Sequence, residues 1–231
     1  MKKLMMIAAM MVATMTANAQ FEPGTFSIQP KLGGTGAWLT NMPDLDVPIS
    51  DYHNIKLDKQ PTGGFIIGGE VEYQLTKMFS IAAGVNYAQQ GSGWKDEDLN
   101  INGVKMDIKD AKIELAYVNV PLVLNAYLFK GFAVKTGVQF GFLTSADLKA
   151  TMRAEKGNVS NKVEFDKSVK EDFKKFDLSI PVGVSYEFKV PIVIDMRYNI
   201  GLLDINKNKE QGDPTIKNQM LQITAGYKFA L

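Results

Sequence analysis

The feature that most constrains this chain is a strict alternation of apolar residues with polar, small or proline residues. From Phe176 to Phe188 every second residue is apolar, and the same alternation runs through residues 79–88, 192–203 and 221–229. Successive side chains of a β-strand point to opposite faces, whereas a helix repeats its faces about every 3.6 residues. These four segments therefore predict β-strands with one apolar face.

Four further segments have a less regular alternation and bring the predicted number of strands to eight. They are residues 25–39, 62–75, 112–129 and 132–145. A tilted strand crosses the hydrocarbon part of a membrane with roughly 9 to 11 residues, so the segments are long enough to span it.

The connections between these strands alternate in length. Residues 76–78, 130–131 and 189–190 are short connections, and the long ones, rich in Asp, Asn, Lys, Gly and Pro, are residues 40–61, 91–111, 146–175 and 204–217. An even number of strands with short turns at one end and long polar loops at the other is typical of bacterial membrane barrels. The sequence thus predicts an all-β fold, an eight-stranded antiparallel up-and-down transmembrane β-barrel.

The polar face of the strands distinguishes a membrane barrel from a soluble one. A soluble barrel would turn this face to water and tolerate long Lys and Glu side chains at most positions. Here small residues recur on it, as at Gly84, Gly137, Gly183 and Gly226, which suits the crowded interior of a narrow barrel. We expect the apolar face to contact lipid and the polar face to line the lumen.

The charged residues on the polar face have mixed signs and can pair with one another. They are Lys31, Lys135, Arg197 and Lys228 together with Glu70, Glu72, Asp177, Glu187 and Asp195. Buried charges are tolerated when they are paired, whereas a Lys or Arg facing the middle of the lipid costs about 2 to 4 kcal/mol. We predict a salt-bridged lumen network of these nine side chains that plugs the interior.

The first residues of the chain have the pattern of a secretory signal peptide. Lys2 and Lys3 precede an apolar run from Leu4 to Thr16, and Ala17-Asn18-Ala19 has small residues at the two positions that favour cleavage. The apolar run is shorter than the roughly 20 residues of a membrane-spanning helix. We predict a signal peptide at residues 1–19, export from the cytoplasm, and a barrel domain at residues 20–231.

Composition excludes several kinds of function. The chain has no Cys, which excludes disulfides, thiolate zinc sites and a Cys nucleophile. Its 26 Lys and Arg residues nearly balance its 25 Asp and Glu residues, so the chain has no excess positive charge for binding nucleic acid. Because no phosphate-binding loop or HExxH motif is present either, we expect no cofactor.

One enzyme hypothesis rests on the only histidine, His53, which follows Ser50 and Asp51 in the first long loop. His53 would be the general base, Asp51 would orient it, and Ser50 would polarise the substrate or attack it, as in a barrel lipid acyltransferase. Adjacent loop residues rarely converge into a catalytic set, so we expect no enzymatic activity.

Two acidic clusters, Asp44 with Asp46 and Asp96-Glu97-Asp98, could hold Ca²⁺ through oxygen ligands. Neither has the spacing of an EF-hand loop. A solvated acidic loop is the expected interpretation of both.

The segment from Phe165 to Phe176 has Val169 and Phe173 at helical spacing. It predicts either a short amphipathic helix in the third long loop or an extension of a strand. Pro121 and Pro181 lie within predicted strands, where a proline removes a hydrogen-bond donor.

Four segments are similar to those of a known family. They are Tyr117–Leu124, Gly137–Gly141, Val182–Glu187 and Thr224–Phe229. Through them the chain resembles the PorT-like outer-membrane β-barrel family common in Bacteroidetes. The resemblance implies a small barrel in the outer membrane of the cell envelope, without an assigned reaction.

We therefore expect a structural or interaction protein of the outer membrane, with lipid around its strands. The long outer loops would carry any specificity for a protein or a ligand, as loops on a rigid scaffold usually do. Three alternatives remain: a narrow channel for small solutes, a soluble periplasmic lipocalin-like ligand-binding barrel, and the acyltransferase.

Overall fold

The computed structural model describes residues 22–42, 44–50, 53–101, 104–156, 159–208 and 210–231. Strands dominate these ranges, and the helical structure within them is a 3-10 turn, η1, at Lys170–Asp172. No helix in these ranges has the length and hydropathy needed to cross a membrane.

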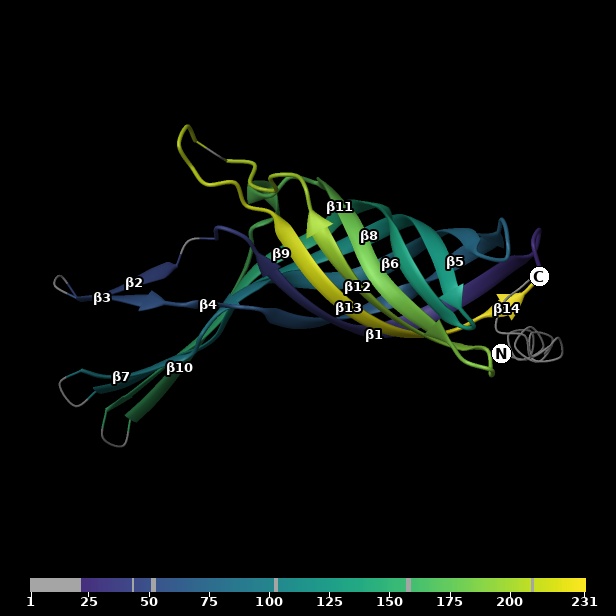
Figure 1. Cartoon of the computed structure of the whole chain (residues 1–231). Helices are drawn as coiled ribbons and strands as arrows, with labels where there is room; N and C mark the ends of the chain where they lie inside the picture. Colours follow the sequence, from purple (N-terminus) through teal and green to yellow (C-terminus); the bar gives the residue numbers. More distant parts are fainter. Residues whose placement is uncertain (1–21, 43, 51–52, 102–103, 157–158, 209) are drawn as a thin grey trace, which may run out of the picture.

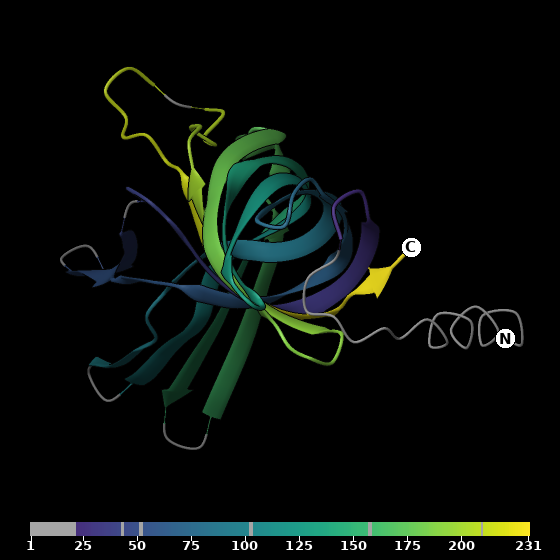
Figure 2. The same ribbon diagram turned by 45° about the vertical axis from the view of Figure 1, so that its right-hand side comes forward.

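Eight strands form a closed antiparallel ring (Figures 1 and 2). They are β1 (Phe26–Leu39), β5 (Thr62–Gln74), β6 (Phe79–Trp94), β8 (Val104–Phe129), β9 (Phe132–Lys156), β11 (Phe176–Glu187), β12 (Ile192–Gly201) and β13 (Asn218–Tyr227). Each pairs with the ring strand before it and the ring strand after it in the sequence. The last strand pairs with the first, from Leu39 with Asn218 to Lys31 with Gly226, and this pairing closes the ring. The eight predicted strands all form, but β6, β8 and β9 run past their predicted ends into the segments expected to be long loops.

Three of the four predicted long loops contain further strands, so the prediction of loops there was wrong. The additional strands are β2 (Leu45–Ser50), β3 (His53–Leu57), β4 (Lys59–Gln60), β7 (Glu97–Ile101) and β10 (Val159–Ser168), while β14 (Phe229–Ala230) lies at the C-terminus. Strands β8 and β9 continue past the ring, because each finds an added partner there, β7 for β8 and β10 for β9. The four outer strands make a sheet in the order β7, β8, β9, β10, which we call the outer sheet; it lies at the end opposite the C-terminus (Figure 1).

The helix considered for residues 165–176 does not form, and the alternative of a strand extension is confirmed for its first part. Residues 165–168 belong to β10, where Phe165 pairs with Ala150 and Ser168 with Asp147 of β9. The ladder with β9 holds these residues in extended conformation, and η1 follows it.

The short connections lie at the same end of the ring as the C-terminus (Figure 1). Between β5 and β6, the Thr76 hydroxyl accepts hydrogen bonds from the backbone N–H groups of Met78 at 3.2 Å and Phe79 at 3.0 Å. Between β8 and β9, Gly131 has a φ of 78°, a conformation that residues with a side chain rarely adopt. Local turn chemistry therefore supports the tight hairpins expected from the sequence.

The structure explains the two prolines within strands. Pro121 pairs with Gln139 of β9, and the ladder of β8 with β6 is interrupted beside it. Pro181 pairs with Asn199 of β12, and the ladder of β11 with β9 is interrupted beside it. Since proline has no N–H to donate, it is accommodated where one of the two ladders is already broken.

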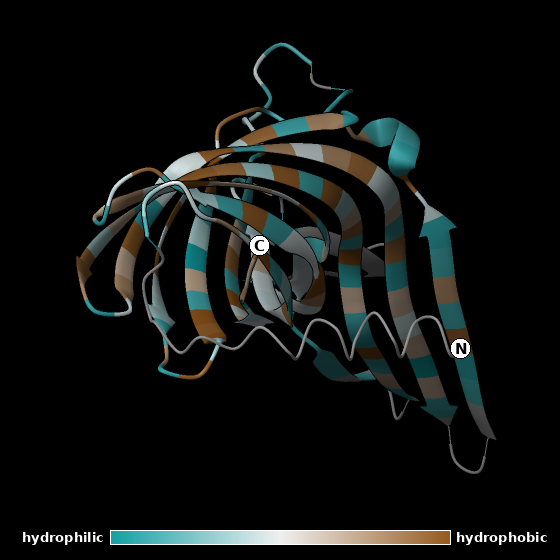
Figure 3. Cartoon of the chain, turned by 90° about the vertical axis from the view of Figure 1, so that its right-hand side faces the viewer, coloured by the Kyte–Doolittle hydropathy of each residue, from teal (hydrophilic) through white to brown (hydrophobic). Residues whose placement is uncertain are grey.

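The ring has its apolar side chains outside and its polar side chains inside. Along β12, Ile192, Ile194 and Met196 are 42%, 39% and 45% exposed, whereas Asp195 and Arg197, which alternate with them, are 0% and 1% exposed. The same alternation appears as apolar and polar bands along the ring strands (Figure 3). This arrangement is the reverse of that in a soluble barrel, and it suits contact with lipid tails.

Aromatic rings cluster on the outside near both ends of the ring. At the end with the short turns, the contacting pairs are Phe26–Tyr73, Phe129–Phe132, Tyr186–Phe188 and Tyr227–Phe229. Towards the outer sheet, they are Trp38–Tyr198, Phe65–Tyr87, Phe140–Phe176 and Phe142–Phe176. Two such belts are typical of the two membrane interfaces.

A charge placed in the apolar band should therefore cost far more than the same charge on the outer sheet. Val182 lies in the middle of β11 and is 44% exposed, and Val163 lies on β10 and is 62% exposed. We expect Val182→Arg to lower the free energy of unfolding by about 2 to 4 kcal/mol in lipid vesicles, and Val163→Arg to have little effect. Chemical denaturation measures both, and equal losses would contradict the placement of the band.

Candidate functional site

The interior of the ring is the most unusual chemical environment in the molecule. All nine charged residues that the sequence assigned to the lumen are buried, and none is more than 5% exposed. They are Lys31, Glu70, Glu72, Lys135, Asp177, Glu187, Asp195, Arg197 and Lys228. They divide into two ion-paired clusters and one separate carboxylate.

Five of these residues form a continuous chain of ion pairs that we call the central cluster. Arg197 donates to both carboxylate oxygens of Glu70, from Nη1 and Nη2 at 2.7 Å each, and Nη2 also donates to Asp195 Oδ2 at 2.9 Å. At one end of this series, Lys31 Nζ lies 2.5 Å from Glu70 Oε1, and at the other end Lys135 Nζ lies 2.6 Å from Asp195 Oδ2. Side chains from β1, β5, β9 and β12 thus meet in the lumen. The two-pronged Arg197–Glu70 contact is the strongest geometry available to such a pair.

Three more charged residues form a second group, the turn-end cluster. Lys228 Nζ lies 3.1 Å from Glu72 Oε2 and 3.0 Å from Glu187 Oε2. The Tyr127 hydroxyl donates to Glu72 Oε1 at 2.6 Å and accepts a hydrogen bond from Lys228 Nζ at 3.1 Å. The Ser80 hydroxyl also donates to Glu72 Oε1, at 2.6 Å. Both carboxylate oxygens of Glu72 therefore have protein partners, two hydroxyls at Oε1 and the Lys228 ammonium at Oε2.

Asp177 is not joined to either cluster, although the sequence placed it in the same network. Among the described residues it forms no ion pair. Its Oδ1 accepts a hydrogen bond from the backbone N–H of Leu178 at 2.8 Å, and the side chain of Asn218 also donates to the carboxylate. The difference arises because Asp177 lies near the start of β11, several residues from the level of Asp195 and Arg197.

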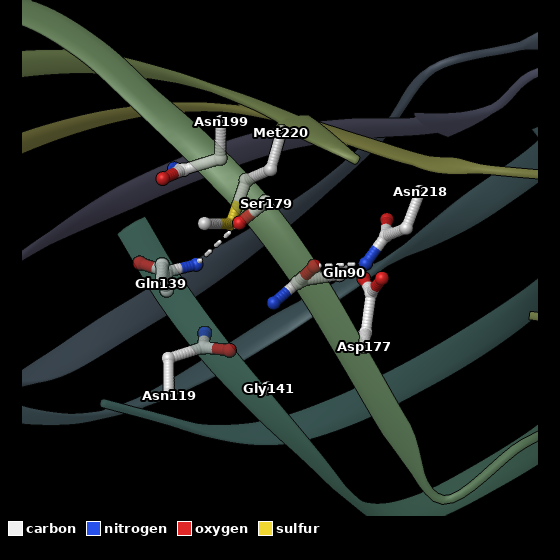
Figure 4. Close-up of a pocket in the computed structure, with 9 residues that line it drawn as sticks. All are labelled: Gln90, Asn119, Gln139, Gly141, Asp177, Ser179, Asn199, Asn218 and Met220. Carbon is white, nitrogen blue, oxygen red and sulfur yellow. Dashed lines mark hydrogen bonds between the residues drawn. The ribbon is translucent and has the colours of Figure 1, made fainter. Parts of the chain in front are cut away.

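Asp177 faces a small cavity that we call the polar chamber (Figure 4). Its lining consists of Gln90, Asn119, Gln139, Gly141, Asp177, Ser179, Asn199, Asn218 and Met220. Within it the Nε2 of Gln139 donates to the Ser179 hydroxyl at 3.4 Å, and Asn218 Nδ2 donates to Gln90 Oε1. The five amides come from five different ring strands, β6, β8, β9, β12 and β13, so closure of the ring is what brings them together.

A buried apolar cluster, the apolar cap, lies beyond the chamber on the side of the outer sheet. Its members are Leu39, Met42, Leu57, Trp94, Ile108, Ala111, Leu115, Tyr117, Leu143, Ala146, Phe173 and Ile205. The segment between β10 and β11 and the segment between β12 and β13 both contribute to it. A hydrogen bond from the Lys174 N–H to the Ile205 carbonyl at 2.8 Å joins these two segments. Sequence reasoning assigned Leu57, Trp94, Phe173 and Ile205 to polar loops and missed this core. The presence of such large apolar side chains within polar segments was the one sequence feature that could have indicated a buried cluster there.

The catalytic hypothesis at His53 receives no side-chain test from the structure. Asp51 lies outside the described residues, and at Ser50 and His53 only the backbone is described, where the two residues pair across the β2–β3 hairpin. The hairpin forms a separate sheet of two strands.

The acidic clusters are engaged with protein groups. Asp44 lies 3.9 Å from Lys59 Nζ, and Asp98 lies 3.7 Å from Lys109 Nζ. Asp96 accepts a hydrogen bond from the backbone N–H of Asp110 at 3.0 Å. In the described part of the chain, no group of three or more His, Asp or Glu residues has the arrangement of a metal site.

Comparison with known proteins gives one match to a family and several similar structures. A family model described as outer membrane protein beta-barrel domain matches residues 18–207. The chain is similar to Ail, the attachment invasion locus protein of Yersinia pestis, with 14% identity, coverage of 90% of this chain and 99% of that chain, and a TM-score of 0.41.

Two other outer-membrane proteins are similar at the same low level. For OprG from Pseudomonas aeruginosa the identity is 14%, the coverage 92% and 99%, and the TM-score 0.38. For the outer membrane protease OmpT from Escherichia coli the identity is 13%, the coverage is 95% of this chain and 99% of that chain, and the TM-score is 0.35. No curated protein matches the chain in sequence.

The central cluster predicts that two carboxylates at the same distance from a lysine contribute very differently to the free energy of unfolding. Glu70 and Glu164 each lie 2.5 Å from a Lys Nζ, but Glu70 is buried and Glu164 is exposed. We expect Glu70→Gln to lower the free energy of unfolding by about 3 to 5 kcal/mol, because Lys31 and Arg197 lose a buried partner. Glu164→Gln should cause no measurable loss, since water solvates Lys162. Urea titration in vesicles measures both, and similar effects of the two substitutions would contradict the role of the cluster.

Proposed function

Because the chain belongs to the outer membrane protein beta-barrel domain family, we propose that it is a closed membrane anchor whose outer sheet binds a partner outside the cell. The family places it in the outer membrane as a β-barrel protein. The proposal adds that the lumen conducts no solutes and that the protein acts by interaction and not by catalysis.

The observation that carries the proposal is how the interior is filled. Arg197 and Glu70 lie at most 3% exposed within the central cluster, and the apolar cap lies beyond the polar chamber. A solute crossing the ring would have to separate buried ion pairs and then pass through packed apolar side chains, both of which are costly. These features favour a closed lumen over a narrow channel.

The outer sheet supports the interaction role. It continues the ladders of two ring strands, so its position is set by the same hydrogen bonds that hold the ring. Strand β10 pairs only with β9 in the described part of the chain, and its second edge has backbone groups available to another strand. Val163 and Phe165 on β10 are 62% and 44% exposed. An extended peptide segment with apolar residues at alternate positions fits such an edge.

The proposal also covers how the chain is exported and which group within the family it resembles. Residues 1–19 would be a signal peptide, and both ends of the mature chain would lie in the periplasm. Residues 1–21 lie outside the described residues, so this part rests on the charge and hydropathy of the sequence. The similarity of Tyr117–Leu124 and three other segments supports a PorT-like barrel of Bacteroidetes within the larger family.

The closed lumen can be tested by electrical recording. We expect purified full-length protein to insert into planar bilayers without adding discrete steps of conductance, because the central cluster and the apolar cap fill the ring. Heat-modifiable gel migration of the same sample provides the control that the protein is folded. Reproducible unitary conductance from folded protein would favour the narrow channel.

The orientation of the outer sheet can be tested by cysteine labelling, because the chain contains no native Cys. Asn161 on β10 and Lys77 in the β5–β6 turn are both exposed, and they lie at opposite ends of the molecule. In intact cells we expect a membrane-impermeant maleimide to label Asn161→Cys and to leave Lys77→Cys unlabelled until the outer membrane is disrupted. The opposite pattern would reverse the orientation and remove the proposed role of β10.

A further inference from the structure

The free edge of β10 is the longer of the two edges of the outer sheet. Strand β10 has ten residues and, among the described residues, pairs with β9 alone, whereas β7 at the other edge has five residues. Just past the end of β10, the Val169 N–H donates to the Ala146 carbonyl of β9 at 2.8 Å. Backbone groups of successive residues in a strand point to opposite sides. The N–H and C=O groups of Lys162 and Glu164 therefore point to the free edge.

The two faces of β10 differ in chemistry. Val163 and Phe165 lie on one face and are 62% and 44% exposed. Lys162, Glu164 and Asp166 lie on the other face and are all exposed, with Lys162 Nζ 2.5 Å from Glu164 Oε1. A strand that extends the sheet at this edge has to continue the apolar face on one side and the charged face on the other. A second β10 has this alternation.

Two copies of β10 can join their free edges by a half-turn about an axis perpendicular to the sheet. The two strands then run antiparallel, and the apolar faces of both sheets lie on the same side. A half-turn about an axis along the strands would make them parallel and would put the apolar face of one copy beside the charged face of the other. The antiparallel arrangement therefore continues both faces across the junction.

The charges of β10 select the register of this ladder. The free-edge groups of one strand meet those of the other only when the axis passes between two copies of the same residue. If that residue is Lys162, Glu164 or Phe165, two like charges lie directly opposite each other, which destabilises a ladder. If it is Val163, each Lys162 lies opposite a Glu164 of the other copy. An axis nearer either end of β10 pairs a shorter stretch.

Building on the proposed binding role of the outer sheet, we infer that its partner is a second copy of this chain, joined by antiparallel pairing of the two β10 strands about Val163. Strand β10 runs from the far end of the outer sheet back to the ring, so the two rings lie at opposite ends of the joined sheet (Figure 1). Such a contact connects two membranes. Single cross-strand pairs are weak, and many copies on two facing surfaces act together.

Cysteine crosslinking tests the register, because the chain has no native Cys. The two copies of Val163 would form a non-hydrogen-bonded pair with Cα atoms about 4.5 Å apart, which a disulfide can span. We expect Val163→Cys in lipid vesicles to give a disulfide-linked dimer under mild oxidation.

The matched control for crosslinking is Phe165→Cys, on the same face of the same strand. In the proposed register its two copies lie about 13 Å apart, which excludes a disulfide. Equal dimer formation by both variants, or none by Val163→Cys, would overturn the register.

Charge exchange tests the contact between membranes. Full-length protein is inserted into two populations of vesicles that carry different dyes and expose the outer sheet, and tethering is measured as coincidence of the two dyes. The wild type should tether. Lys162→Glu and Glu164→Lys should each lose tethering to themselves, because like charges face each other across the ladder. Vesicles with Lys162→Glu should tether to vesicles with Glu164→Lys.

The double variant Lys162→Glu/Glu164→Lys is the control for composition and net charge. It exchanges the two charges, keeps each opposite its counterpart in the second copy, and should tether as the wild type does. Heat-modifiable gel migration verifies that every variant is folded. Loss of tethering in the folded double variant would show that the two residues do not face each other.

Failure of this inference can be told apart from failure of the proposed function. If folded wild-type vesicles do not tether, a second copy is not the partner. External labelling of Asn161→Cys in intact cells would in that case still leave the outer sheet free to bind a different partner.

Discussion

The two-pronged ion pair between Glu70 and Arg197 is the interaction on which the interior of this protein depends. It connects β5 with β12 across the lumen, and Lys31 and Asp195 extend it to both sides. These groups lie where water cannot replace a lost partner, so each charge requires the others. On the outer face, which lipid surrounds, the same charges would be far from any partner. The charged side chains of every ring strand therefore have to point into the lumen.

The space for this network comes from the small residues of the neighbouring strands. A Cβ atom at Gly84 would lie 2.5 Å from Glu70 Cγ, and one at Gly183 would lie 2.9 Å from Arg197 Cγ. A ring of eight strands is just wide enough for side chains to fill it, so long charged side chains on some strands require glycine on others. In the function proposed above, the ring would act as the support, and recognition of a partner would fall to the outer sheet.

Much of the ring follows from residue patterns along single segments. Alternation over residues 176–188 and its counterparts predicted the eight strands, and the same alternation assigned Lys31, Glu70 and the other charged residues to the inner face. The outer strands were not predicted, because the polar residues of β7 and β10 resemble a loop until their ladders with β8 and β9 are known. The apolar cap was missed for a related reason, since its members are scattered from Leu39 to Ile205 and meet only after the ring has closed.

The sequence by itself determined the number of ring strands, their order and the face that each side chain occupies, because a strand repeats its faces every two residues whatever lies beside it. Only the tertiary structure decided which charges meet. Register places Arg197 at the level of Glu70 and Asp195, and it leaves Asp177 among amides. Partner choice depends on distances across the lumen between strands far apart in the chain, and no local pattern encodes those distances.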